Sequence, residues 1–110
     1  MTVVSVDQIK VGIKKFIEME LASKANGVTK FLIYFVLPSI DKETQNMINI
    51  ARENTLFSSL FDENGQILLD DVYMRASEAI NKTGKIVIDK FGISLDRTDI
   101  EKLYQYIRGV

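Results

Sequence analysis

The stretch KFLIYFVL, residues 30–37, decides what kind of core this chain can build. Every position from Phe31 to Leu37 is apolar, so the segment shows neither a helical nor a strand period. Its aromatic and β-branched content favours a buried strand, whereas Thr29 as an N-cap favours a short buried helix. The residues leave both open. In either case we expect this segment at the centre of the core, because a segment that is apolar all round must be covered on every side.

Amphipathic helices are predicted on both sides of this segment. Before it, residues 9–21 repeat apolar side chains at helical spacing, and Ser5 and Gln8 have the spacing of a capping box. After it, residues 42–54 form a second such helix. We expect the second helix to turn these residues inward: Met47, Ile48 and Ala51.

The next apolar residues, Leu56, Phe57, Leu60 and Phe61, are spaced as on one face of a short helix. The two phenylalanines have two interpretations. They either fill the core or form a contact surface whose solvent side is left open. Phe57 and Phe61 are therefore candidate protein-contact residues.

Residues 62–71, DENGQILLDD, resemble the later part of a calcium-binding EF-hand loop. With Gly65 in the sixth position, Leu60 stands where the loop needs its first carboxylate, and Asp71 stands where it needs a bidentate glutamate. We therefore predict a tight turn rather than a metal site. Gly65 would take a positive φ there, and Asp70 or Asp71 would cap the following helix.

The C-terminal third is predicted to hold a helix, a hairpin and a last helix. The expected elements are a helix over roughly 71–83, strands over 85–89 and 93–95 with a turn at 90–92, and a last helix that is capped by Thr98 and ended by Gly109. Thr98 and Glu101 have capping-box spacing at the start of the last helix. The fold class predicted for the chain is mainly α. It is one domain, 1–110, of about five helices with a short β-hairpin before the C-terminal helix.

The composition of the chain limits the classes of function that we expect for it. The chain has 110 residues, is 46% hydrophobic and carries a formal net charge of −1, which suits one globular domain. It contains neither Cys nor His, and so lacks thiolate chemistry and the commonest general base. Its glycines are single and each is expected to close an element, so no phosphate-binding loop is predicted. We expect no enzyme, no cofactor and no metal.

Membrane and nucleic-acid partners are not expected. The longest apolar run, seven residues, is far below the ~20 residues that span a bilayer. The first residues, MTVVSVDQIK, lack the basic segment and apolar run of a signal peptide. Lysines 10, 14 and 15 could share a helix face, but acidic residues are interleaved throughout the chain.

Two tyrosines of the last helix complete the candidate contact residues. Tyr104 belongs to its apolar stripe, whereas Tyr106 lies off that stripe and beside Arg108. An exposed tyrosine with a nearby arginine is typical of a protein–protein contact. The full set of candidates is Phe57, Phe61, Tyr104 and Tyr106.

Four short motifs follow one another along the C-terminal half. They are Asp62-x-x-Gly65-x-Ile67-x-x-Asp70-x-x-Tyr73-x-x-Ala76, Gly84-Lys85-Ile86, Gly92-Ile93-x-Leu95 and Asp99-Ile-Glu-Lys-Leu-Tyr-x-Tyr-Ile107. With these motifs, residues 56–108 resemble small proteins encoded in prophages and phage-tail-like elements of Clostridium- and Bacillus-type bacteria. The resemblance implies a phage-associated role and a helix at 31–37. Its motifs are turns, caps and an apolar stripe, so it supplies no catalytic residues.

Two hypotheses follow for the function. The first is a non-enzymatic interaction protein, a structural or assembly accessory component of a phage tail or tail-like particle, which leaves room for a homo-oligomer. The alternative is a soluble phage-encoded regulator or inhibitor that binds a host protein. Both place the protein in the bacterial cytoplasm, and the first also places it in the particle.

Overall fold

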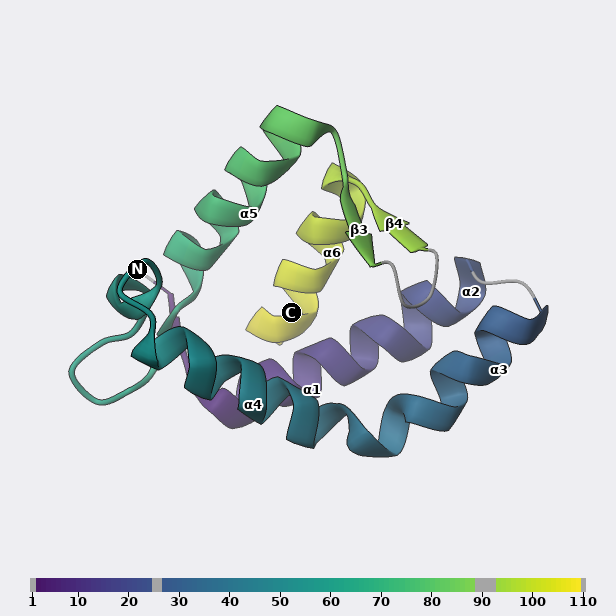
Figure 1. Cartoon of the computed structure of the whole chain (residues 1–110), viewed down its shortest axis with the longest axis horizontal. Coiled ribbons are helices and arrows are strands. Elements are labelled where there is room, and N and C mark those ends of the chain that lie inside the picture. The colour runs from purple at the N-terminus through teal and green to yellow at the C-terminus, as the bar shows by residue number, and fades with distance from the viewer. Residues whose placement is uncertain (1, 25–26, 89–92, 110) are drawn as a thin grey trace.

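The computed structural model describes residues 2–24, 27–88 and 93–109, with the backbone alone at 24, 28–30, 32, 36, 88 and 93. Most of this chain is helical (Figure 1). The helices are α1 (Val6–Phe16), α2 (Ala22–Lys24), α3 (Gly27–Val36), α4 (Ile40–Glu53), α5 (Leu69–Thr83) and α6 (Arg97–Arg108). A π-helical segment, η1 (Ile17–Leu21), joins α1 to α2, and two 3-10 turns are η2 (Leu37–Ser39) and η3 (Ser58–Leu60). The strands are β1 (Val3–Val4), β2 (Ile67–Leu68), β3 (Ile86–Ile88) and β4 (Ile93–Leu95).

The predicted fold class is confirmed. Within the described ranges, five helices have ten or more residues, and β3 and β4 form an antiparallel hairpin directly before α6. Ile86 pairs with Leu95 in this hairpin, and the predicted turn at 90–92 lies outside the described residues. None of the described helices is both long enough and apolar enough to cross a bilayer.

The centre of the fold is the packing of α6 along α1. Gly12 makes this approach possible, because a Cβ atom at this position would lie 2.5 Å from the Cα atom of Ile107. Gly12 is therefore buried in the middle of a helix, and our expectation that every glycine closes an element is wrong here. Gly84 and Gly109 do close α5 and α6, with φ of 82° and 78°.

The π segment η1 sets the direction of the end of the first helix. Leu21 follows Phe16 by five residues, and in a regular α-helix the two side chains would diverge. The i→i+5 hydrogen bonds of a π segment slow the rotation of successive side chains, which returns Leu21 toward the face of Phe16. Both side chains are buried in the same cluster.

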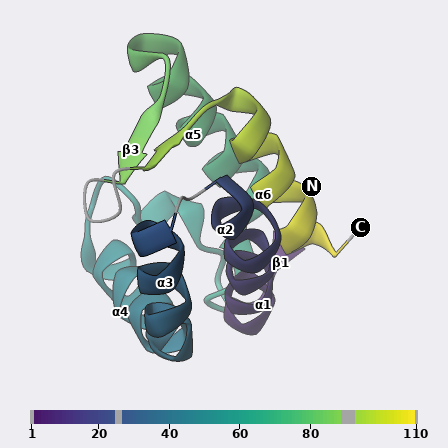
Figure 2. The same cartoon turned by 90° about the vertical axis from the view of Figure 1, so that its right-hand side faces the viewer.

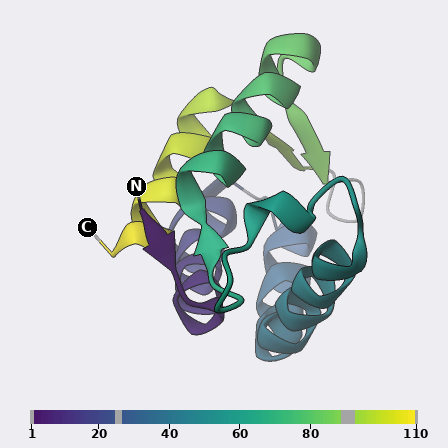
Figure 3. The ribbon, with the colours of Figure 1, turned by 90° about the vertical axis from the view of Figure 1, so that its left-hand side faces the viewer.

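Two apolar clusters make up the core, and Leu103 of α6 contacts both. The buried residues of the first are Phe16, Leu21, Ile33, Ile80, Leu95 and Ile100. The buried residues of the second are Val4, Ile9, Ile48, Ile67, Leu69 and Ile107. Helix α6 thus joins the hairpin end of the molecule to the end that holds the N-terminus (Figure 3).

The N-terminal strand is a feature that the sequence did not predict. Strand β1 pairs antiparallel with β2, with Val3 opposite Leu68. The backbone N–H of Thr2 donates to the Asp70 carboxylate at 2.9 Å, and the Thr2 carbonyl accepts from the Leu69 N–H at 3.0 Å. Because α5 begins at Leu69, Asp70 lies within its first turn and ties down the N-terminus instead of capping the helix.

The two predicted capping boxes need correction. At α1, Ser5 accepts from the Gln8 N–H at 3.1 Å as expected, but the Gln8 side chain donates to the Ile107 carbonyl at 3.0 Å instead of returning to the cap. The start of the last helix is also earlier than predicted. Asp96 is the N-cap of α6 and makes a complete capping box with Asp99.

The apolar segment at 30–37 forms most of α3 and then enters η2. Only part of our expectation for it holds: Ile33 is buried in the first cluster, but Phe31, Tyr34 and Phe35 are exposed. The expectation that this segment is the centre of the core is therefore wrong. The main contacts of α3 are with its sequence neighbours α2 and η2, and the helix lies at one end of the molecule (Figure 1).

Candidate protein-contact surfaces

The outer side of α3 is a row of aromatic side chains. Phe31, Tyr34 and Phe35 stand at i, i+3 and i+4, which places them on one face of the helix. They are 69%, 51% and 75% exposed, while Ile33 points the other way into the core. Figure 2 shows α3 on the near side of the molecule, beside α2 and α4. We call Phe31, Tyr34 and Phe35 the aromatic ridge.

The size of the ridge matches that of the largest apolar patch on a typical monomer. The exposed parts of its three side chains amount to roughly 400 Å², taking ~200 Å² for a whole aromatic side chain. The largest apolar patch on a typical monomer is about 300–600 Å² and is often functional. A patch of this size, built from only three neighbouring residues, is typical of a protein–protein contact.

A groove lies between α4 and the elements that face it, with α1 on one side and η3 on the other. It consists of an inner recess of about 230 Å³ and an adjoining outer recess of about 300 Å³. We call these recesses together the α4 groove. Its residues are Ile9, Ile13, Thr44, Met47, Ile48, Ile50, Ala51, Asn54, Phe57, Leu60, Phe61, Ile67 and Val72.

The solvent side of the α4 groove is formed by two apolar residues of α4. Met47 is 70% exposed and Ile50 is 67% exposed. We expected Met47 to face inward, and this is wrong: the buried side of α4 runs through Thr44 and Ile48, which leaves Met47 on the flank of the helix. Met47, Ala51 and Leu60 line both recesses, so the apolar lining continues from one to the other.

The structure places Phe57 and Phe61 at the α4 groove. Phe57 lines the outer recess and is 39% exposed, with the Arg75 guanidinium 5.5 Å from its ring centre. Phe61 is half-buried in the inner recess, with the Arg52 guanidinium 5.3 Å from its ring centre. Of the two interpretations of this segment, Phe61 fits core packing and Phe57 fits an open surface.

Tyr104 points away from both surfaces, into the seam between α5 and α6. Its hydroxyl donates to the Asp70 carboxylate, and the Arg108 guanidinium lies 5.4 Å from its ring centre. This hydrogen bond, together with the one from the Thr2 N–H, lowers the pKa of Asp70. The same hydrogen bond raises the pKa of the Tyr104 hydroxyl. Tyr104 therefore holds α6, α5 and the N-terminus together.

Tyr106 lies two residues further on and points to the opposite side of α6, toward η1. Its hydroxyl donates to Glu20 Oε1 at 3.0 Å, which raises the pKa of Tyr106. Lys102 contacts Glu20 Oε2 at 3.3 Å, and the Tyr106 and Phe16 rings pack in an edge-type arrangement with their centres 6.4 Å apart. Tyr106 is half-buried, and its contacts hold α6 against η1 and the end of α1.

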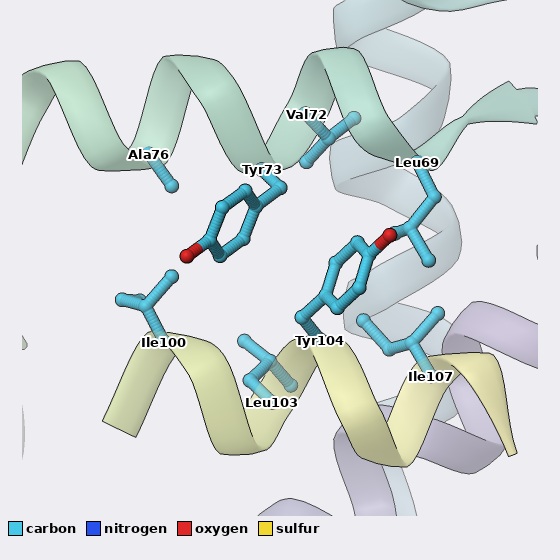
Figure 4. A pocket seen from close by; sticks show the side chains of 8 residues that line it. All are labelled: Leu69, Val72, Tyr73, Ala76, Ile100, Leu103, Tyr104 and Ile107. Carbon is cyan, nitrogen blue, oxygen red and sulfur yellow. The ribbon is translucent and has the colours of Figure 1, made fainter. Parts of the chain in front are cut away.

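A small recess lies within the α5–α6 seam (Figure 4). Its volume is about 60 Å³, well below the ~300–1,000 Å³ of ordinary ligand pockets. Figure 4 shows Tyr73 and Tyr104 across it with their hydroxyls pointing in opposite directions, and their ring centres are 4.9 Å apart. The remaining lining is aliphatic. The recess is a loosely filled part of the helix seam.

The 62–66 segment forms the predicted turn. Asp62 Oδ1 accepts the N–H groups of Asn64 and Gln66, both at 2.9 Å, and Gly65 has a φ of 76°. Arg52 donates to the Gly65 carbonyl at 2.6 Å. Across the described ranges, no group of three or more His, Cys, Asp or Glu side chains is placed to hold a metal ion. The Asp62 carboxylate thus stabilises the turn by accepting these backbone hydrogen bonds.

The aromatic ridge was not predicted from the sequence, although a signal for it was present. If residues 31–37 are helical, Phe31, Tyr34 and Phe35 must share one face. The short η2 connection then sends the chain directly into α4, so the helix has few neighbours. The comparisons with known proteins add nothing to this, because protein-family models, curated proteins and solved structures gave no match.

Proposed function

We propose that this protein is a non-enzymatic interaction protein, a structural or assembly accessory component of a phage tail or tail-like particle. The observation that carries the proposal is the aromatic ridge, since three exposed rings on one helix face suit a contact with another protein. The phage association rests on the resemblance of residues 56–108. The protein works from the bacterial cytoplasm and joins the particle there.

The roles of the interior polar groups support a non-enzymatic protein. The Asp70 carboxylate accepts from Thr2 and Tyr104, and the Glu20 carboxylate accepts from Tyr106 and Lys102. Asp96 and Asp99 are used by the cap of α6. These carboxylates all hold elements of the fold together.

The four residues proposed from the sequence divide between two roles. Phe57 and Phe61 line the α4 groove and remain proposed contact residues, with Phe57 at the solvent edge. Tyr104 and Tyr106 hold the seams of α6. The aromatic ridge joins the first pair as the main contact surface of the proposal.

The proposal is tested by purifying particles from a producing bacterium and measuring this protein in them by quantitative mass spectrometry. We expect a fixed ratio of the protein to the particle, and a loss of incorporation when Phe31 and Phe35 are both changed to Gln. A matched control changes two exposed apolar residues outside both surfaces, Val11→Gln and Met74→Gln, and keeps incorporation. Intact particles without the protein would overturn the proposal. Stable recovery with one host protein instead would favour the regulator hypothesis.

A further inference from the structure

The two apolar surfaces of this chain lie on different helices of a molecule whose longest dimension is 43 Å. Helix α3, which carries the aromatic ridge, lies at one end of that dimension (Figure 1). The outer recess of the α4 groove is lined by the second half of α4 together with Phe57 and Leu60. The first surface is a ridge and the second is a recess, so the ridge of one copy has a groove to meet on a second copy.

The recesses of the α4 groove match aromatic rings in size and chemistry. An aliphatic cavity of about 150 Å³ binds benzene, so the inner recess of about 230 Å³ has room for a phenyl ring. Apart from Thr44, the residues that line the inner recess are apolar. A ring that enters it meets apolar walls and leaves no buried charge unpaired.

The spacing of the ridge also fits two adjoining recesses. Phe31 and Phe35 are four residues apart, which is about 6 Å along a helix axis at 1.5 Å per residue. The inner and outer recesses adjoin through Met47, Ala51 and Leu60. One ring for each recess is the helix-in-groove arrangement that many proteins use to recognise a partner helix.

We propose that the partner of the aromatic ridge is a second copy of this chain, whose α4 groove receives Phe31 and Phe35, so that copies join head to tail. The inference rests on the proposed function, because it names the partner of the same surface. A two-fold contact between two α3 helices would cover the ridges alone and leave every α4 groove open. The head-to-tail contact covers both surfaces with one interface and leads to rings or filaments.

The area of the contact sets its strength. The ridge contributes roughly 400 Å² per copy, about half of the ~800 Å² per partner in a standard interface. A contact of this size is reversible, so the isolated protein associates in a concentration-dependent way. In a particle, where many copies lie side by side, the same weak contact is reinforced by multivalency.

Sedimentation velocity over a series from low micromolar to near-millimolar protein tests the proposal, with three variants of the full chain. The ridge variant carries Phe31→Gln and Phe35→Gln, the groove variant carries Met47→Glu and Ile50→Glu, and the control carries Val11→Gln and Met74→Gln. All six positions are exposed, so each variant is expected to fold, and circular dichroism verifies this. We expect wild type and control to grow past the dimer. In the ridge variant and in the groove variant, we expect association to be weaker than in wild type by roughly ten-fold or more.

Mixing the ridge variant with the groove variant gives the sharpest result. The intact ridge of one fits the intact groove of the other, so the equimolar mixture forms a mixed dimer that cannot grow. Dimerisation of the groove variant alone would instead mean a two-fold α3 contact and overturn the proposal. Wild type that stays monomeric at every concentration would also overturn it. The proposed function would survive that second result if the ridge variant still failed to enter particles.

Discussion

Helices α3 and α6 have similar lengths and opposite surroundings. Each residue of α3 from Phe31 to Val36 is apolar, yet its aromatic ridge faces solvent. Helix α6 is half polar, yet Ile100 and Ile107 are buried between α1 and α5. The more apolar helix is thus the less covered one.

This difference teaches that topology rather than hydrophobicity decides which side chains are buried. Helix α6 is the last helix in the sequence, and α1, α5 and the hairpin pack around its apolar stripe. Helix α3 is held between α2 and η2 and touches the core through Ile33. A helix that is apolar all round and has one covered side has a second side available for a partner.

The largest expected effect compares one residue from each helix. Ile100→Ala leaves a cavity in the first cluster and lowers the free energy of unfolding by about 3 kcal/mol. Phe35→Ala removes a larger side chain, but one that faces solvent, and costs less than about 0.5 kcal/mol. Urea unfolding of dilute protein measures both. Equal losses for the two variants would contradict the difference between the helices.

A pair of glycine substitutions tests the same difference through the backbone. Gly12→Ala places a methyl group against the Ile107 backbone and forces α1 and α6 apart, which lowers the free energy of unfolding by about 2 kcal/mol. Gly27→Ala at the start of α3 is the matched control, because a Cβ there meets nothing within 4 Å. It is neutral or slightly stabilising, by up to about 0.5 kcal/mol, through the unfolded chain. Thermal melts of both variants check this.

A smaller effect of pH is expected from the seam of α6. The pKa of Asp70 is lower in the folded protein, so its bond to Tyr104 stabilises the fold above the ordinary value of 3.8 and is lost as the pH falls through the folded value. The pKa of the Tyr104 hydroxyl is raised in the folded protein. Its contribution to the stability of the fold is therefore present below the ordinary pKa of 10.0 and is lost as the pH rises through the folded value.

Tyr104→Phe removes this bond and provides the measurement. The variant has a lower free energy of unfolding than wild type from about pH 5 to about pH 9, and the difference narrows on both sides of that window. Urea unfolding at a series of pH values follows it. A difference that stays constant into acid and alkali would show that Tyr104 acts through packing alone.

The smallest effect is expected at the edge of the α4 groove. Arg52 donates to the Gly65 carbonyl and lies over Phe61, but it is exposed, so Arg52→Met lowers the free energy of unfolding by about 0.5 kcal/mol. Arg75→Met, which loses the contact with Phe57 alone, costs less. A loss above about 2 kcal/mol for either variant, measured by urea unfolding, would mean that this edge belongs to the core.

Local signals were enough to predict most of the fold from the sequence. Apolar spacing marked α1, α4, α5 and α6, and single glycines marked the ends of α5 and α6. Where two local patterns competed, the prediction took the wrong one. Thr98 with Glu101 was predicted as the capping box of the last helix, but Asp96 with Asp99 has the same spacing and is the box that forms.

The missed features depend on residues that are distant in the sequence. Strand β1 has two residues, and its pairing with β2 joins Val3 to Leu68, so no local period marks it. Gly12 was missed as a packing site because only its approach to Ile107 reveals the role. Among the candidate site residues, Phe57 and Phe61 were placed at a groove, whereas the ridge required knowing which side of α3 the fold leaves open.

Amide hydrogen exchange at low and high protein concentration tests the difference between the helices most directly. In dilute solution, we expect the amides of α3 to exchange fast, because one side of this helix has few contacts, and those of α6 to exchange slowly. At high concentration, α3 gains protection as its ridge is covered, while α6 is unchanged. Protection of α3 that already equals that of α6 in dilute solution, and does not rise with concentration, would contradict this interpretation.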